Sequence, residues 1–149
     1  MSEALLTNPL EDNAMSGNLQ AATTSKTMFR VGWAMSGLTI LFMLFDGISK
    51  LAMEHHVVEA TAKIGYPVDV IRPLGFILLL STVLYAVPRT AIFGAILLTG
   101  YLGGAVASKV RIDDPLFSSV LFGVYFGVIA WGGLYLRDER LRTLVPWRH

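Results

Sequence analysis

Two opposite charges stand four residues apart in the stretch FDGISK, where Asp46 and Lys50 follow a long apolar run. An unpaired aspartate deep in a bilayer costs about 2.5–3.5 kcal/mol on insertion scales, so a compensating partner is expected. Lys50 lies one helical turn away, with the acid N-terminal to the base, and Arg72 is a second candidate partner. Two interpretations stay open: a structural ion pair that holds helices together, or a site for a ligand, a proton or a quinone.

The depth of the two charges follows from the rise of a helix, about 1.5 Å per residue. Arg30 and Lys50 are then about 30 Å apart, the thickness of a hydrocarbon core, so Lys50 marks the boundary and can snorkel to it. Asp46 lies about 6 Å deeper. It belongs to a narrow stripe of small and polar residues, a pattern typical of a face turned toward other helices. The stripe consists of Gly32, Ser36, Thr39, Met43, Asp46 and Lys50.

Aromatic residues with polar groups supply the next candidates. Tyr85, Trp131 and Tyr135 lie near the predicted cytoplasmic boundary and are typical of an interfacial belt. Tyr101 and Tyr125 lie deeper and need a hydrogen-bond partner, and Tyr101 is taken as a ligand-binding candidate with Asp46, Lys50 and Arg72. Small residues four apart predict close helix packing: Gly100, Gly104, Ser108, Gly123 and Gly127.

A metal site is not expected. The chain has no cysteine, and its histidines are His55, His56 and His149. Adjacent histidines on a helix point in different directions, and His55 with Glu59 is a weak pair. Asp113 and Asp114 precede Pro115 and are interpreted as an N-cap of the following helix. A net charge of +1 gives no basic footprint for nucleic acid.

These residues lie in a chain whose composition is that of a membrane protein. Of its 149 residues, 54% are hydrophobic and only 15% charged, against about 25% charged in an ordinary globular protein. Residues 1–27 are polar and aperiodic and are predicted to be a disordered tail. An all-α, four-helix transmembrane bundle is predicted for 28–146, with spans of about 31–52, 70–87, 90–108 and 115–136.

The links between spans indicate the topology. Only Pro88, Arg89 and Thr90 separate the second and third spans, so these must form a tight antiparallel hairpin. The first link is longer, and its apolar residues could form a short helix on the membrane surface before Gly65 and Pro67 end it. Seven Lys and Arg residues flank the side that carries both termini and five flank the other. We therefore expect both termini in the cytoplasm and a multi-pass protein of the cell (inner) membrane.

Several motifs together resemble one family. They are Asp46-Gly47-x-x-Lys50, IGYP from Ile64 to Pro67, YAVPRTAIFGAILLTGYLGGAVASKVR from Tyr85 to Arg111, PLF from Pro115, WGGLYLR from Trp131, and LRTLVP from Leu141. Over residues 28 to 146 the chain resembles the DoxX-like family of small four-helix membrane proteins. The stretch PRTAIFGAILLTGYLGGA is the most specific part of the resemblance.

What the resemblance implies about activity is limited. Relatives look like membrane subunits of quinone-linked sulfur oxidation or are associated with defence against oxidative stress, beside soluble redox partners. Without cysteine, an electron-transfer role needs a bound quinone or a redox partner protein. The leading hypothesis is a redox-associated protein that binds a quinone or another lipophilic molecule between helices near the outer leaflet. The alternatives are a non-catalytic membrane scaffold or partner-recruiting subunit, and a small membrane enzyme or transporter for an apolar metabolite. A homo-oligomer is also compatible with the sequence.

Overall fold

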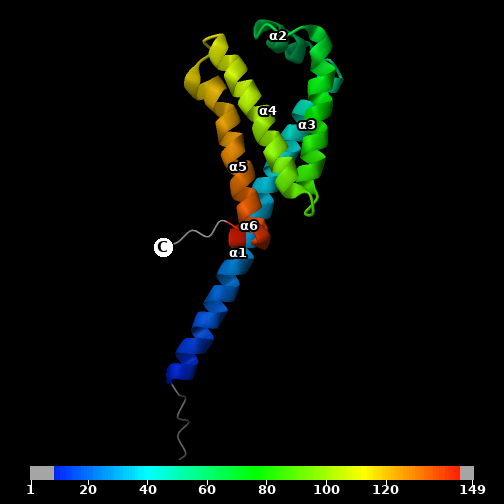
Figure 1. The fold of residues 1–149 in the computed structure, drawn as a ribbon. Coiled ribbons are helices and arrows are strands. Elements are labelled where there is room, and N and C mark those ends of the chain that lie inside the picture. The colour runs from blue at the N-terminus through cyan, green and yellow to red at the C-terminus, as the bar shows by residue number, and fades with distance from the viewer. Residues whose placement is uncertain (1–8, 145–149) are drawn as a thin grey trace, which may run out of the picture.

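Four long helices and two short ones make up the computed structural model, which describes residues 9–144 (Figure 1). The long helices are α1 (Pro9–Leu51), α3 (Ile71–Ala86), α4 (Ala91–Arg111) and α5 (Leu121–Arg137). The short ones are α2 (His55–Lys63) and α6 (Glu139–Leu144), and a 3₁₀ turn (Val68–Val70) and a π turn (Leu116–Val120) precede α3 and α5. No strand occurs within these residues, so the predicted all-α class is confirmed.

The long helices form a ring in which each contacts two neighbours. Helix α1 packs against α3 and α5, and α4 packs against the same two helices from the opposite corner. Four segments are long and apolar enough to cross a membrane: Lys26–Leu51, Val68–Ala86, Ala91–Arg111 and Leu116–Arg137. These agree closely with the four predicted spans and confirm the four-helix bundle.

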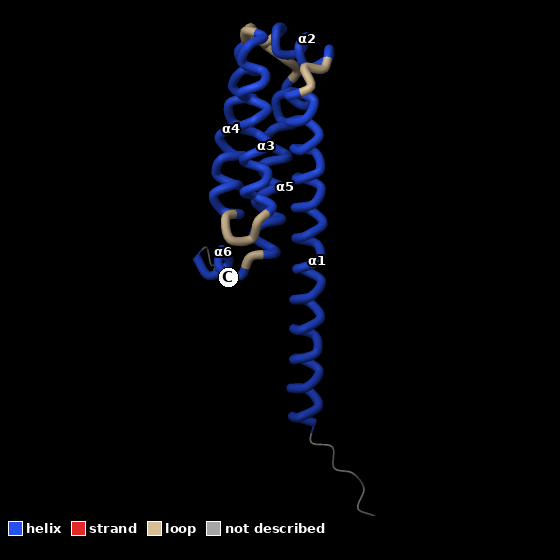
Figure 2. Tube along the Cα trace, turned by 90° about the vertical axis from the view of Figure 1, so that its right-hand side faces the viewer, coloured by secondary structure: helices blue, strands red, loops and turns tan. Residues whose placement is uncertain are grey.

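Helix α1 is much longer than its span and extends past the other helices at the end where α6 lies (Figure 2). It includes residues 9–27, which the sequence analysis placed in a disordered tail, whereas residues 1–8 lie outside the described part. Proline is well suited to a first helical turn, where its missing N–H is no loss. Because the apolar span already provides the helix nucleus, each added residue contributes a hydrogen bond without a new nucleation cost.

The hairpin between α3 and α4 is as tight as predicted. The Thr90 backbone N–H donates to the Val87 carbonyl at 3.0 Å, and the Thr90 hydroxyl donates to the Leu84 carbonyl at 2.9 Å. The two helices can meet closely because Gly94 has no side chain to strike the backbone of Tyr85. Any larger residue at Gly94 would force α3 and α4 apart.

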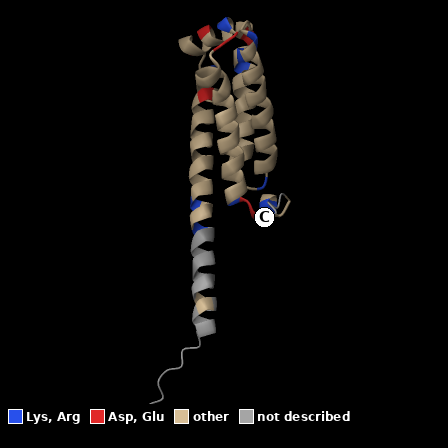
Figure 3. Cartoon of the chain, turned by 90° about the vertical axis from the view of Figure 1, so that its left-hand side faces the viewer, with Lys and Arg blue, Asp and Glu red and all other residues tan. Residues whose placement is uncertain are grey.

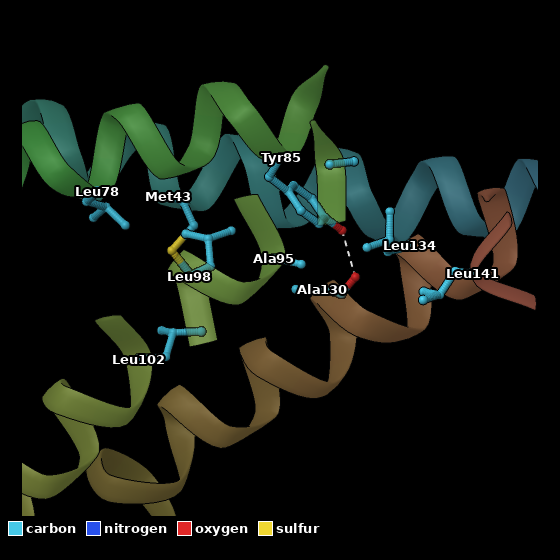
Figure 4. Close-up of a cluster of buried hydrophobic side chains, with 10 residues drawn as sticks. Met43, Leu78, Tyr85, Ala95, Leu98, Leu102, Ala130, Leu134 and Leu141 are labelled. Atoms are coloured by element: carbon cyan, nitrogen blue, oxygen red, sulfur yellow. Dashed lines mark hydrogen bonds between the residues drawn. The ribbon is translucent and has the colours of Figure 1, made fainter. Parts of the chain in front are cut away.

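The core runs along the inside of the ring (Figure 4). Met43 of α1, Leu78 of α3, Leu98 of α4 and Leu134 of α5 are all at most 1% exposed. The stripe predicted on α1 faces this interior, since Gly32, Ser36, Thr39 and Met43 are buried. Side chains on the opposite face of α1, such as Leu41 and Phe45, are exposed and suit a lipid environment.

Candidate functional site

The Asp46–Lys50 pair forms on the last turns of α1. The ammonium nitrogen Nζ of Lys50 lies 2.5 Å from Asp46 Oδ1. The Lys50 side chain is only 15% exposed and that of Asp46 32%, so both are partly withdrawn from the surface. The pair predicted from the spacing is therefore present.

A close crossing of α1 and α3 holds Lys50 in place. A Cβ atom added to Gly75 would lie 2.8 Å from Lys50 Cβ and 3.1 Å from the Gly47 carbonyl oxygen. A Cβ added to Gly47 would lie 2.7 Å from Leu79. Two glycines, one on each helix, thus allow the backbones to touch beside the ion pair. The sequence analysis noted Gly47 only as part of a motif and did not single out Gly75.

Tyr101 of α4 reaches the same place from the opposite corner of the ring. Its ring centroid lies 6.0 Å from Lys50 Nζ, at the outer limit of a cation–π contact. Because α1 and α4 are not neighbours in the ring, the three side chains meet across the interior of the bundle. We call Asp46, Lys50 and Tyr101 the polar cluster.

The polar cluster keeps hydrogen-bonding capacity. Asp46 uses Oδ1 for Lys50, and its other carboxylate oxygen accepts no hydrogen bond from the described residues. The Tyr101 hydroxyl likewise has no hydrogen-bond partner among residues 9–144. A phenol, an ammonium and a carboxylate can together donate to a carbonyl oxygen, accept from a hydroxyl and exchange a proton.

Arg72 does not join the polar cluster. It is exposed at the start of α3, and no ion pair with Asp46 forms. Tyr125, the other deep tyrosine, is 49% exposed on α5. His55 pairs with Glu59 at 3.0 Å on the exposed surface of α2, and no group of three His, Asp or Glu within the described residues could hold a metal ion. His149 lies outside those residues.

The predicted packing residues divide into two groups. Gly123 meets α4 closely, since a Cβ there would lie 2.9 Å from Val106, and Ser108 is buried with its hydroxyl 3.0 Å from that of Tyr66. Gly100 and Gly104 instead face outward, with nothing within 4 Å of an added Cβ. These two do not pack against another of the described helices, because a small-residue spacing predicts a close approach without saying which face makes it.

Gly127 lies on a groove between α4 and α5 that has a volume of about 680 Å³. A hydrogen bond of 2.8 Å from Trp131 Nε1 to the Thr99 hydroxyl joins the two helices there. No charged residue lines the groove, so it suits an apolar body. Its lining comprises Thr99, Leu102, Gly103, Val106, Gly123, Val124, Gly127, Val128, Trp131, Gly132, Tyr135 and Leu141.

Tyr85 is the polar residue that the sequence analysis misjudged. It was assigned to an interfacial belt, but it is fully buried, and its hydroxyl donates to the Ala130 carbonyl at 2.7 Å (Figure 4). The same hydroxyl lies 3.1 Å from Ser36 Oγ. Arg137, counted only as a boundary cation, donates to the Tyr85 carbonyl at 2.6 Å. Its guanidinium lies 4.9 Å from the Trp33 ring and 4.8 Å from the Tyr85 ring. The position of Ser36 on the buried stripe was the one sequence signal for this network.

At the other end of the bundle, α2 is tied to the end of α4. Arg111 donates to the Ile64 carbonyl at 2.5 Å, and Lys63 lies 3.0 Å from Asp114 Oδ1. Asp114 was expected to cap the fourth span, but its Oδ2 accepts from the Ser119 hydroxyl at 2.8 Å, and the helix start at Pro115 has no side-chain cap. Hydrogen bonds from Lys63 and Ser119 lower the pKa of Asp114.

Comparison with known proteins identifies the family. The model of the DoxX-like family matches residues 34–133, which include the polar cluster, the α3–α4 hairpin and most of α5. No curated protein matches, and no solved structure matches. The match covers well over half of the chain and agrees with the four apolar helices. The chain is an integral membrane protein and belongs to the DoxX-like family.

Proposed function

We propose that this protein binds a quinone, or a closely similar lipophilic molecule with a flat polar ring, at the polar cluster. The observation that carries the proposal is the meeting of Asp46 and Lys50 from α1 with Tyr101 from α4 across the interior of the bundle. Charged side chains inside a membrane bundle are costly and rare. When they occur, a functional site is the default interpretation. The unused carboxylate oxygen and hydroxyl provide the binding groups.

The chemistry of a quinone suits these three side chains. Its carbonyl oxygens accept hydrogen bonds, which the Lys50 ammonium and the Tyr101 hydroxyl can donate. Reduction of the ring to a quinol takes up protons as well as electrons, and the Asp46–Lys50 pair can pass a proton to the ring oxygen. The chain has no cysteine, so the electrons would come from a redox partner protein.

The location follows from the depth of the cluster. Asp46 and Lys50 end the first span, so a ligand there would lie in the leaflet opposite the α6 end. With the seven-to-five excess of Lys and Arg that the sequence predicts for the side of both termini, the ligand would lie in the outer leaflet of a cell (inner) membrane. The groove between α4 and α5 would take only apolar parts of a ligand, because it has no charged lining.

The closed ion pair favours a second candidate, a scaffold without a ligand. At 2.5 Å the two charges compensate each other, and together with the Gly47–Gly75 crossing they hold α1 against α3. In that case Tyr101 would contribute packing alone. An enzyme or transporter for an apolar metabolite, and a homo-oligomer, stay predictions.

Lipids that co-purify with the protein separate the two candidates. The full chain is extracted in mild detergent, and bound small molecules are identified by mass spectrometry. A quinone is expected at up to one per chain, and Asp46→Asn should lower its amount while the variant still inserts and folds. Asp69→Asn, which removes an exposed carboxylate outside the cluster, is the matched control and should retain the quinone. A folded wild-type protein free of quinone, even after quinone is added back, would support the scaffold.

A further inference from the structure

A basic hollow lies at the α6 end of the bundle, far along α1 from the polar cluster. Lys26 and Arg30 of α1 and Arg142 of α6 enclose it together with Phe29 and Glu139, and its volume is about 250 Å³. Figure 3 shows Lys and Arg on α1 at the same level as the C-terminal segment. Three cationic side chains and one carboxylate thus line the hollow, which leaves it with an excess of positive charge.

The α1 side of the hollow stands at the membrane boundary. Lys26 begins the first span, and Arg30 lies one turn further in, about 6 Å along the axis. Residues spaced three and four apart lie on one helix face, so Lys26, Phe29 and Arg30 point the same way. The start of the first span, as length and hydropathy assign it, therefore places the hollow at the expected level of lipid headgroups and their phosphates.

The α6 side is held by its own contacts. Asp138 Oδ1 accepts from the Arg140 backbone N–H at 2.9 Å, which caps the helix, and Leu141 is buried in the core. Arg142, the next residue, is therefore placed over α1 by a fixed helix. Its Nε is buried and has no hydrogen-bond partner among the described residues. Buried donors without a partner are rare, so this N–H points to an acceptor from outside the described residues.

We propose that this hollow binds a phosphate-bearing anion. Guanidinium groups form paired hydrogen bonds with phosphate oxygens, and Lys26 adds a point charge. The same chemistry is found in the headgroup of an anionic phospholipid and in a soluble phosphate compound. The position at the boundary favours the headgroup, because each basic residue near the surface strengthens the attraction of anionic lipid. This inference does not depend on the quinone proposal.

Charge variants of α6 test the site with a built-in control. The full chain is held in micelles containing either phosphatidylglycerol or phosphatidylcholine, and retained lipid is counted by native mass spectrometry. Arg142→Gln should weaken phosphatidylglycerol binding about fivefold. Arg140→Gln removes the same charge from an exposed position outside the hollow and should change binding much less. Glu139→Gln removes the one carboxylate and should strengthen binding.

The source of the anion is separated by a second arm with inorganic phosphate. If phosphatidylglycerol raises the melting temperature and inorganic phosphate does not, the ligand is the lipid headgroup. If inorganic phosphate alone raises it, and Arg142→Gln abolishes the rise, the ligand is a soluble phosphate compound. Equal effects of the Arg140 and Arg142 variants, or weaker binding by Glu139→Gln, would show only diffuse attraction and overturn the proposal.

Discussion

Removal of the Tyr85 hydroxyl should loosen the bundle without emptying its core. Tyr85→Phe keeps the ring, so its packing and its contact with the Arg137 guanidinium at 4.8 Å remain. The variant loses the 2.7 Å hydrogen bond to the Ala130 carbonyl and the 3.1 Å contact with Ser36. One hydrogen bond contributes about 0.5–1.5 kcal/mol net, and an interhelical one in a membrane averages about 0.6.

The expected loss of stability is larger than that of one hydrogen bond, because the buried Ser36 hydroxyl loses its partner as well. Ser36 can rotate toward the carbonyl four residues earlier on α1, which limits its loss. We therefore expect Tyr85→Phe to lower the free energy of unfolding by about 1–2 kcal/mol.

Reversible unfolding in mixed micelles, followed by tryptophan fluorescence, measures this change. Tyr125→Phe is the matched control, since Tyr125 is 49% exposed, and its effect should stay within about 0.5 kcal/mol. If the two variants are equally stable, the network around Tyr85 does not join α1, α3 and α5, and the reasoning fails.

Two further predictions concern helix crossings and pH. Gly75→Ala should lower the free energy of unfolding by about 1–3 kcal/mol in the same assay, because its Cβ would lie 2.8 Å from Lys50 Cβ, whereas Gly100→Ala should not, since nothing lies within 4 Å. Equal losses would contradict the close crossing. The lowered pKa of Asp114 means that its link to Lys63 contributes fully above the ordinary value of 3.8 and is lost as pH falls through the lowered pKa. Hydrogen exchange in α2 should therefore rise in that acidic range, and Asp114→Asn should remove the dependence; an unchanged profile would refute it.

Periodicity and hydropathy were sufficient for the spans and for the choice of Asp46, Lys50 and Tyr101 as candidates, but they also placed Arg72 with them, which lies exposed away from the polar cluster. The stripe on α1 placed Asp46 and Lys50 on an inward face, and the depth of Tyr101 selected it as a candidate. Both are local properties. The order of polar and apolar residues along one helix decides which face is polar, and the rise per residue decides how deep a side chain lies.

Partners from other helices could not be predicted in the same way. Tyr85 lies near the end of its span, so its sequence position fits an interfacial residue. Its hydroxyl is buried instead, because Ala130 of α5 and Ser36 of α1 provide its hydrogen-bond partners. The small-residue spacings identified only part of the packing for a similar reason: Gly123 packs closely, Gly100 and Gly104 do not, and Gly75, which lies outside any spacing that we singled out, makes a close crossing beside the site. Which helix neighbours which is a long-range property that spacing alone does not contain.

The central claim is that the polar cluster holds the ring of a quinone, and Tyr101→Phe tests it most directly. The hydroxyl bonds no described residue, so its loss should leave stability unchanged. Titration with a short-tailed quinone should show binding weakened about two- to twelvefold, the value of one hydrogen bond. Tyr125→Phe, the exposed control, should bind as the wild type does. Equal affinities for all three proteins, or no binding by any of them, would contradict the claim.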